Sequence, residues 1–101
     1  MKYSYIGSMR TKPGRRDEVI AIMLSSVDGL KAAGCHSYVV CASEQDPDII
    51  WVTEVWQSKE HHDASLKLPE VGAAVATAMP MLTGEFTRQE LSVVGGLGLG
   101  D

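Results

Sequence analysis

The pattern of hydrophobic and polar positions is most informative over residues 49–56, which read Ile-Ile-Trp-Val-Thr-Glu-Val-Trp and are apolar at all but two positions. β-Branched and aromatic residues dominate this segment and the turn sequence Gln-Asp-Pro-Asp precedes it, which together predict a β-strand. Successive side chains of a strand point to opposite faces. One face carries Ile49, Trp51, Thr53 and Val55, and the other carries Ile50, Val52, Glu54 and Trp56. Both faces are largely apolar, so each needs a cover. We expect a second copy of this short chain to supply one of them.

The same reasoning places three more strands and three helices along the chain. Strands are predicted over 3–11, 35–44 and 85–94, where β-forming residues lie between turn or glycine signals. A helix is predicted over 15–33, because its apolar residues keep helical spacing and a glycine follows at 34. Ser58 caps a short helix to about residue 67, and Pro69 opens another. The inner stripe of that last helix is Val71, Val75, Ala78 and Met79.

This order of elements is β-α-β-β-α-β, with the second helical region broken in two. It predicts an α+β, ferredoxin-like fold with a four-stranded antiparallel sheet and helices on one face. The open face would bury its apolar side chains against a second sheet, which gives a homodimer with a barrel-like core. Residues 1–95 form the predicted domain, and the glycine-rich segment 96–101 is a predicted flexible tail.

Composition removes several classes of function. The net charge of −4 offers no basic surface for nucleic acid or for acidic membranes. No apolar run approaches the roughly 20 residues that span a bilayer, and residues 1–5 lack the core of a signal peptide. A cytoplasmic protein is expected. Cys35 and Cys41 lie on one predicted strand, ~20 Å apart, too far for a disulfide. We expect two buried thiols.

Three segments resemble the antibiotic biosynthesis monooxygenase family of the dimeric α/β-barrel superfamily: Lys-Pro-Gly at 12–14, the strand 51–56 with its Glu-x-Trp end, and Leu-Pro-Glu-Val at 68–71. The resemblance covers Tyr3 to Val94. It implies a pocket between sheet and helices, and oxidation of electron-rich phenols or quinols by O2 without metal or flavin. The expected activity is that of a cofactor-independent monooxygenase acting on a small quinol-like or polyphenolic aromatic substrate.

Two alternatives to this enzyme remain open. The first is a non-catalytic dimeric module for small-ligand binding or scaffolding, with its pocket filled by its own side chains. The second is haem binding or degradation. A haem-degrading branch of the family uses an Asn in its first strand, and residues 3–11 contain none. The family's usual helix His falls here at Ser65.

Cofactor-free oxygenation needs an apolar pocket, one base and a hydrogen-bond donor for the anion. His62 is the first candidate base, because imidazole titrates near neutrality; the alternative is a solvated helix His beside two acids. Trp56 offers an indole donor, or simply packs. Glu54 is a carboxylate on an apolar strand and needs a partner. It is either catalytic, or bound to Arg88, Arg10 or a backbone amide at the dimer interface.

Four further residues are candidates for contact with substrate: Tyr38, His36, Met23 and Met79. His36 alternates with Tyr38 along one strand and would reach either the core or the pocket. The two methionines fit an adaptable interior. No metal site is expected, because the adjacent residues His61 and His62 point about 100° apart on a helix and the His-x-x-x-His spacing of helical metal sites does not occur.

Overall fold

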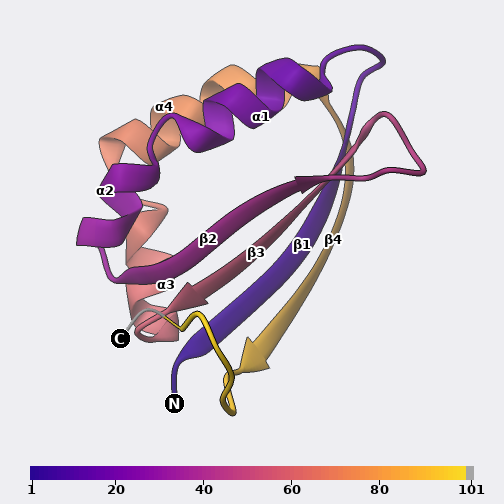
Figure 1. Ribbon diagram of the computed structural model, residues 1–101. Coiled ribbons are helices and arrows are strands. Elements are labelled where there is room, and N and C mark those ends of the chain that lie inside the picture. Colours follow the sequence, from indigo (N-terminus) through magenta and orange to yellow (C-terminus); the bar gives the residue numbers. More distant parts are fainter. Residues whose placement is uncertain (100–101) are drawn as a thin grey trace.

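The computed structural model describes residues 1–99 as a curved antiparallel sheet with helices over its concave face (Figure 1). The elements are β1 (Tyr3–Thr11), α1 (Arg16–Leu24), α2 (Val27–Ala32), β2 (Cys35–Ala42), β3 (Ile49–Trp56), α3 (Lys59–Ser65), α4 (Pro69–Ala78), the 3-10 turn η1 (Met79–Met81) and β4 (Leu82–Ser92). The sheet order is β2-β3-β1-β4, so β1 and β3 are central. The predicted α+β, ferredoxin-like architecture is confirmed.

Strands β1 and β3 begin and end where the sequence predicts. The single helix predicted over 15–33 is wrong, because the chain breaks into α1 and α2 at two serines. Ser25 Oγ donates a hydrogen bond to the carbonyl oxygen of Ile22 at 2.6 Å, and such side-chain bonds compete with helical backbone bonds. The break turns α2 away from the direction of α1 and toward the start of β2 (Figure 1).

The two outer strands differ from their predicted bounds. β2 ends at Ala42, two residues early. β4 begins at Leu82 instead of 85 and ends at Ser92. Gly84 was expected to precede this strand, but it lies inside β4. Its φ of 91° is a left-handed conformation that glycine adopts at little cost. The flexible tail over 96–101 stays a prediction; its last two residues lie outside the described ones.

The two faces of β3 have different surroundings. Ile50, Val52, Glu54 and Trp56 are all buried under the helices. On the opposite face Trp51 is 40% exposed, and Val39 on β2 is 47% exposed. Cys41 pairs in register with Trp51 on this uncovered face and is exposed, so the prediction that both thiols are buried is wrong for Cys41. The second copy over this face stays a prediction.

Two groups of buried side chains form the core between sheet and helices. Tyr3, Leu30, Cys35 and Trp56 pack at one end, and Val19, Ile50, Ala78 and Met81 pack at the other. Of the predicted stripe on α4, Ala78 is buried, whereas Val75 and Met79 are about half exposed. No helix among the described residues is long and apolar enough to cross a bilayer. The cytoplasmic location stays a prediction.

Candidate functional site

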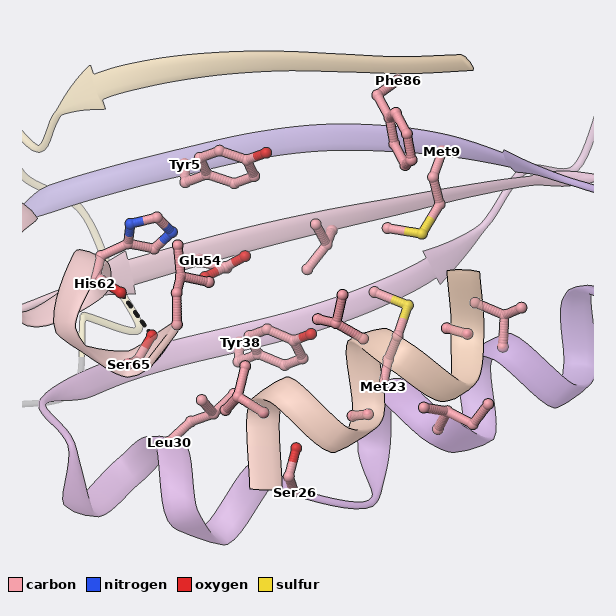
Figure 2. A pocket seen from close by; sticks show the side chains of 18 of the residues that line it. Tyr5, Met9, Met23, Ser26, Leu30, Tyr38, Glu54, His62, Ser65 and Phe86 are labelled. Atoms are coloured by element: carbon pink, nitrogen blue, oxygen red, sulfur yellow. Dashed lines mark hydrogen bonds between the residues drawn. The ribbon is translucent and has the colours of Figure 1, made fainter. Parts of the chain in front are cut away.

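A cavity of ≈ 370 Å³ lies between the concave face of the sheet and the helices. Its two ends differ in chemistry (Figure 2). Tyr5, Tyr38, Glu54, His62 and Ser65 gather at one end. The other end is apolar and is lined by Met9, Ile22, Met23, Val52, Ala78, Leu82 and Phe86, among others. The cavity can therefore hold an apolar ring system whose polar group meets an acid, an imidazole and two phenols.

Strand register creates the polar end. Tyr5 on β1 and Tyr38 on β2 both pair with Glu54 on β3, and residues paired across antiparallel strands project from the same face. Figure 2 shows both tyrosine hydroxyls and the carboxylate directed into the cavity. One row across the sheet thus places a carboxylate between two phenol groups. We call these three residues the acid–phenol row.

Glu54 is held by its neighbour on the same strand. Trp56 Nε1 donates a hydrogen bond to Glu54 Oε1 at 2.8 Å, and no hydrogen bond to Oε2 is found among the described residues. The predicted pairing with an arginine is wrong: Arg10 binds Asp46 and Glu85 instead, and Arg88 makes no ion pair within residues 1–99. Burial raises the pKa of Glu54, while the Trp56 bond and the charge of His62 oppose the rise. The carboxyl thus keeps its proton to a higher pH than an exposed glutamate.

The two phenols of the row serve as hydrogen-bond donors at neutral pH. Burial, followed by the charge of Glu54, raises the pKa of Tyr5 and of Tyr38. Both hydroxyls thus stay protonated and can donate to a ligand oxygen as negative charge develops on it.

His62 faces inward from α3 and does not lie in solvent. Its side chain is 13% exposed, and its ring centroid lies 5.1 Å from that of Tyr3, 5.5 Å from Tyr5 and 5.6 Å from Trp56. His62 Nδ1 lies 3.0 Å from Asp63 Oδ1. This hydrogen bond with His62 lowers the pKa of the Asp63 carboxyl. A carboxylate only accepts, so His62 donates to Asp63 from Nδ1, and in the neutral form of the ring the lone pair lies on Nε2.

Most of the sequence-predicted site residues lie together around the cavity. Glu54, Trp56, His62, Tyr38, Met23 and Met79 all line it. His36 does not: its Nε2 lies 3.0 Å from Gln57 Oε1, in a separate hollow near Lys31 and His61. A register shift between Cys35 and Ser37 displaces this residue from the regular alternation of β2.

Ser65 takes the place where the family resemblance expects a His. It is buried, and its Oγ donates to the carbonyl oxygen of His62 at 2.6 Å (Figure 2). Ser65 therefore holds the backbone of the helical turn that carries His62. Two residues that line the cavity were not among the predicted site residues. Tyr5 alternates with the buried Tyr3 along β1, which is the signal that could have identified it. Arg88 was expected only as a partner for Glu54.

The described residues include no group of three or more His, Cys, Asp or Glu side chains arranged to hold a metal ion. Cys35 is also unsuited to redox chemistry, because burial raises the pKa of its thiol to about 11 and the reactive form is the thiolate.

Residues 3–77 match the model of the family described as antibiotic biosynthesis monooxygenase. The chain is 45% identical to a protein from Chloroflexus aurantiacus whose crystal structure is assigned, by inference, as that of an antibiotic biosynthesis monooxygenase. The match covers 99% of this chain and 100% of that one, with a TM-score of 0.89.

More distant structures share the fold. A protein from Caulobacter crescentus with the same inferred assignment is 20% identical, with a TM-score of 0.84 over 93% of this chain and 91% of that one. Rv0793 from Mycobacterium tuberculosis is 18% identical, with a TM-score of 0.81 over 96% of this chain and 99% of that one. A comparison with curated proteins finds no match.

Proposed function

Because the chain belongs to the antibiotic biosynthesis monooxygenase family, we propose that it is a cofactor-independent monooxygenase that oxidises a small quinol-like or polyphenolic aromatic substrate with O2. The observation that carries the proposal is the cavity itself. Apolar walls suit an aromatic ring, and the acid–phenol row with His62 meets the ring's hydroxyl at one end. This combination supplies a base, donors for the resulting anion and exclusion of water.

The reaction begins with proton transfer from a bound phenol. Direct reaction of O2 with a closed-shell phenol is spin-restricted, whereas a phenolate can donate one electron. His62 Nε2 is the proposed base, with Glu54 as a second acceptor next to it. The hydroxyls of Tyr5 and Tyr38 then stabilise the phenolate oxygen. Trp56 acts as a positioning residue, since its indole N–H is already bound to Glu54.

Electron transfer to O2 gives a radical pair, which combines at a ring carbon as a hydroperoxide. Loss of water from that hydroperoxide leaves a new carbonyl. A quinol of formula C10H8O2 and one O2 would thus yield a hydroxyquinone, C10H6O3, and one water. One oxygen atom enters the product and the other leaves as water, so the substrate supplies all four electrons.

Oxygen uptake tests the proposal. A panel of hydroquinones and naphthalenediols is incubated with the protein, and uptake is corrected for autoxidation in its absence. We expect His62→Asn to lower the rate by about 100-fold, within the usual contribution of a general base. His61→Asn is the matched control, because His61 lies on the same helix outside the cavity and binds Ser58. No uptake above autoxidation for any substrate would refute the proposal.

The enzyme is proposed to work as a homodimer through the uncovered face of the sheet. That face exposes three large apolar side chains to 40–47%, namely Trp51, Val39 and Leu91, and burial of exposed apolar side chains favours association. Two such faces pressed together would bury these side chains and stiffen the sheet that forms the cavity floor.

The non-catalytic alternative makes a different prediction for the cavity. A scaffolding module would fill the space with its own side chains, yet Met23 and Met79 line an open cavity here. A binding module without catalysis would take up the same aromatics with no consumption of O2, so the uptake assay separates the two functions.

A further inference from the structure

Arg88 differs from the other arginines of the chain. Arg10 and Arg15 form ion pairs with carboxylates, and Arg16 donates to three backbone carbonyls. No residue in the described part of the chain accepts a hydrogen bond from Arg88. Glu90, the nearest acid on the same face of β4, is bound by Lys59 at 3.0 Å. An arginine fork without a protein acceptor is available to a ligand.

Arg88 also lies where a ligand would meet it. It lines the main cavity, and it lines a second hollow of ≈ 450 Å³ that shares Tyr5, Met9, Val52 and Phe86 with that cavity. Phe86, two residues earlier on β4, is 51% exposed. The side of the cavity toward β4 therefore combines the Arg88 cation with the aromatic face of Phe86; Figure 2 shows Phe86 there.

Gly7 creates this hollow. Gly7 on β1 pairs in register with Val52 on β3 and with Arg88 on β4. These three residues form the row next to the acid–phenol row. Because Gly7 has no side chain, this row has a gap between Val52 and the cationic Arg88. The ring of Tyr5 lies partly over the gap: a Cβ on Gly7 would meet Tyr5 Cε1 at 2.9 Å and the Tyr5 hydroxyl at 3.1 Å. Glycine lets this ring lie flat along β1 and brings its hydroxyl toward the Arg88 side.

Arg88 is the cation that acts on the Tyr5 hydroxyl. Burial and the charges of Glu54 and Glu90 raise the pKa of Tyr5, and the charge of Arg88 opposes the rise. The guanidinium therefore lies within electrostatic reach of the hydroxyl. The two acids near Arg88 on this face of the sheet have other partners: Glu54 on β3 accepts from Trp56, and Glu90 on β4 binds Lys59. A planar guanidinium matches a carboxylate through two parallel hydrogen bonds.

We propose that Arg88 and the Tyr5 hydroxyl form an anion-binding subsite over Gly7, and that the cavity takes an aromatic carboxylate. The carboxylate lies on Arg88 at the edge of the acid–phenol row, and the rings extend from it along the apolar wall toward Phe86 and Met9. This inference rests on one part of the proposed function, namely that the cavity binds a ligand. Because it concerns binding and not oxidation, a failure of the oxygen-uptake assay would leave it standing.

Calorimetric binding of two isosteric probes tests the subsite. The probes are 2-naphthoate and the neutral 2-naphthamide, which differ by one charge. We expect the wild-type protein to bind the acid about tenfold more tightly than the amide at low salt, and to lose much of this preference at high salt because the site is partly exposed. Arg88→Gln should remove the preference and leave amide binding within about twofold. Arg88→Lys should keep a smaller preference, because it keeps the charge without the fork.

Arg15→Gln is the matched control, since Arg15 is a surface arginine paired with Glu18 on α1. Arg88 is exposed and makes no protein hydrogen bond within residues 1–99, so its variants should unfold at the wild-type temperature. If the guanidinium serves only to keep the β4 edge soluble, Arg88→Gln will change neither probe, and the inference is overturned. Equal loss of both probes, or binding of neither by the wild-type protein, would overturn it as well.

Discussion

The bond between Trp56 and Glu54 gives a prediction whose size follows from the structure. Trp56→Phe keeps an aromatic ring at a position that is 1% exposed and removes the N–H donated to Glu54. Hydrogen bonds to charged groups contribute about 1.5–3 kcal/mol, and neutral ones about 0.5–1.5 kcal/mol. In a Glu54→Gln background the same change removes only a neutral bond. The double-mutant cycle should therefore give a coupling of about 1 kcal/mol at pH 8.

The coupling should depend on pH in a defined direction. Burial raises the pKa of Glu54 above that of an unfolded glutamate, so the stability that this group contributes is fully present below its unfolded pKa and is lost as pH rises through the folded pKa. The Trp56 bond limits that loss by stabilising the charged form. Trp56→Phe should raise the pKa of Glu54 further and make stability fall more steeply between pH 4 and pH 8.

Urea unfolding of the four proteins at pH 4 and pH 8 measures the effect, with protein concentration fixed because a dimer would make stability depend on it. We expect coupling of about 1 kcal/mol at pH 8 and close to zero at pH 4, where a protonated Glu54 resembles Gln. Coupling that is absent at pH 8, or equal at both pH values, would refute the assignment of a charged, Trp-supported carboxylate to the cavity.

Three further outcomes follow from the same structure. Trp51→Asp, which puts a charge on the uncovered face, should give a monomer by sedimentation velocity where the wild type gives a dimer; an unchanged dimer would place the interface elsewhere. Gly7→Ala should push the Tyr5 ring into the cavity and weaken binding of 2-naphthoate by about tenfold, while the same change at exposed Gly72, where a Cβ meets no atom within 4 Å, should not. Arg16→Met should lower the free energy of unfolding by about 2 kcal/mol, because Arg16 holds the turn after β2 through three carbonyls; a loss below about 0.5 kcal/mol in urea unfolding would contradict this role.

The local pattern of the sequence was enough to predict the central strands. In β3, eight residues rich in β-branched and aromatic side chains follow a turn sequence, and all four on one face are buried. The helix over 15–33 failed for an equally local reason. Its apolar spacing continues through Ser25, and only the hydrogen bond from that side chain to Ile22 reveals the break.

The arrangement of the site depends on pairing between distant strands, which a single sequence does not encode in any short window. Glu54 was a clear candidate because a carboxylate is unusual on an apolar strand. Its neighbours Tyr5 and Tyr38 lie 49 and 16 residues away and meet it only through the register of three strands. His36 shows the reverse case: strict alternation placed it beside Tyr38, and a register shift at the start of β2 moved it out of the site.

The central claim is that oxygenation takes place in the cavity between sheet and helices. Val52 forms the floor of that cavity without contributing a polar group, so Val52→Phe fills the space and leaves every proposed catalytic residue in place. The direct test is a reaction of the most active quinol with 18O2, analysed by mass spectrometry of the product. The account predicts one 18O atom in the product of the wild-type protein and loss of that product in the folded Val52→Phe variant. Full 18O incorporation by a folded Val52→Phe protein would contradict it.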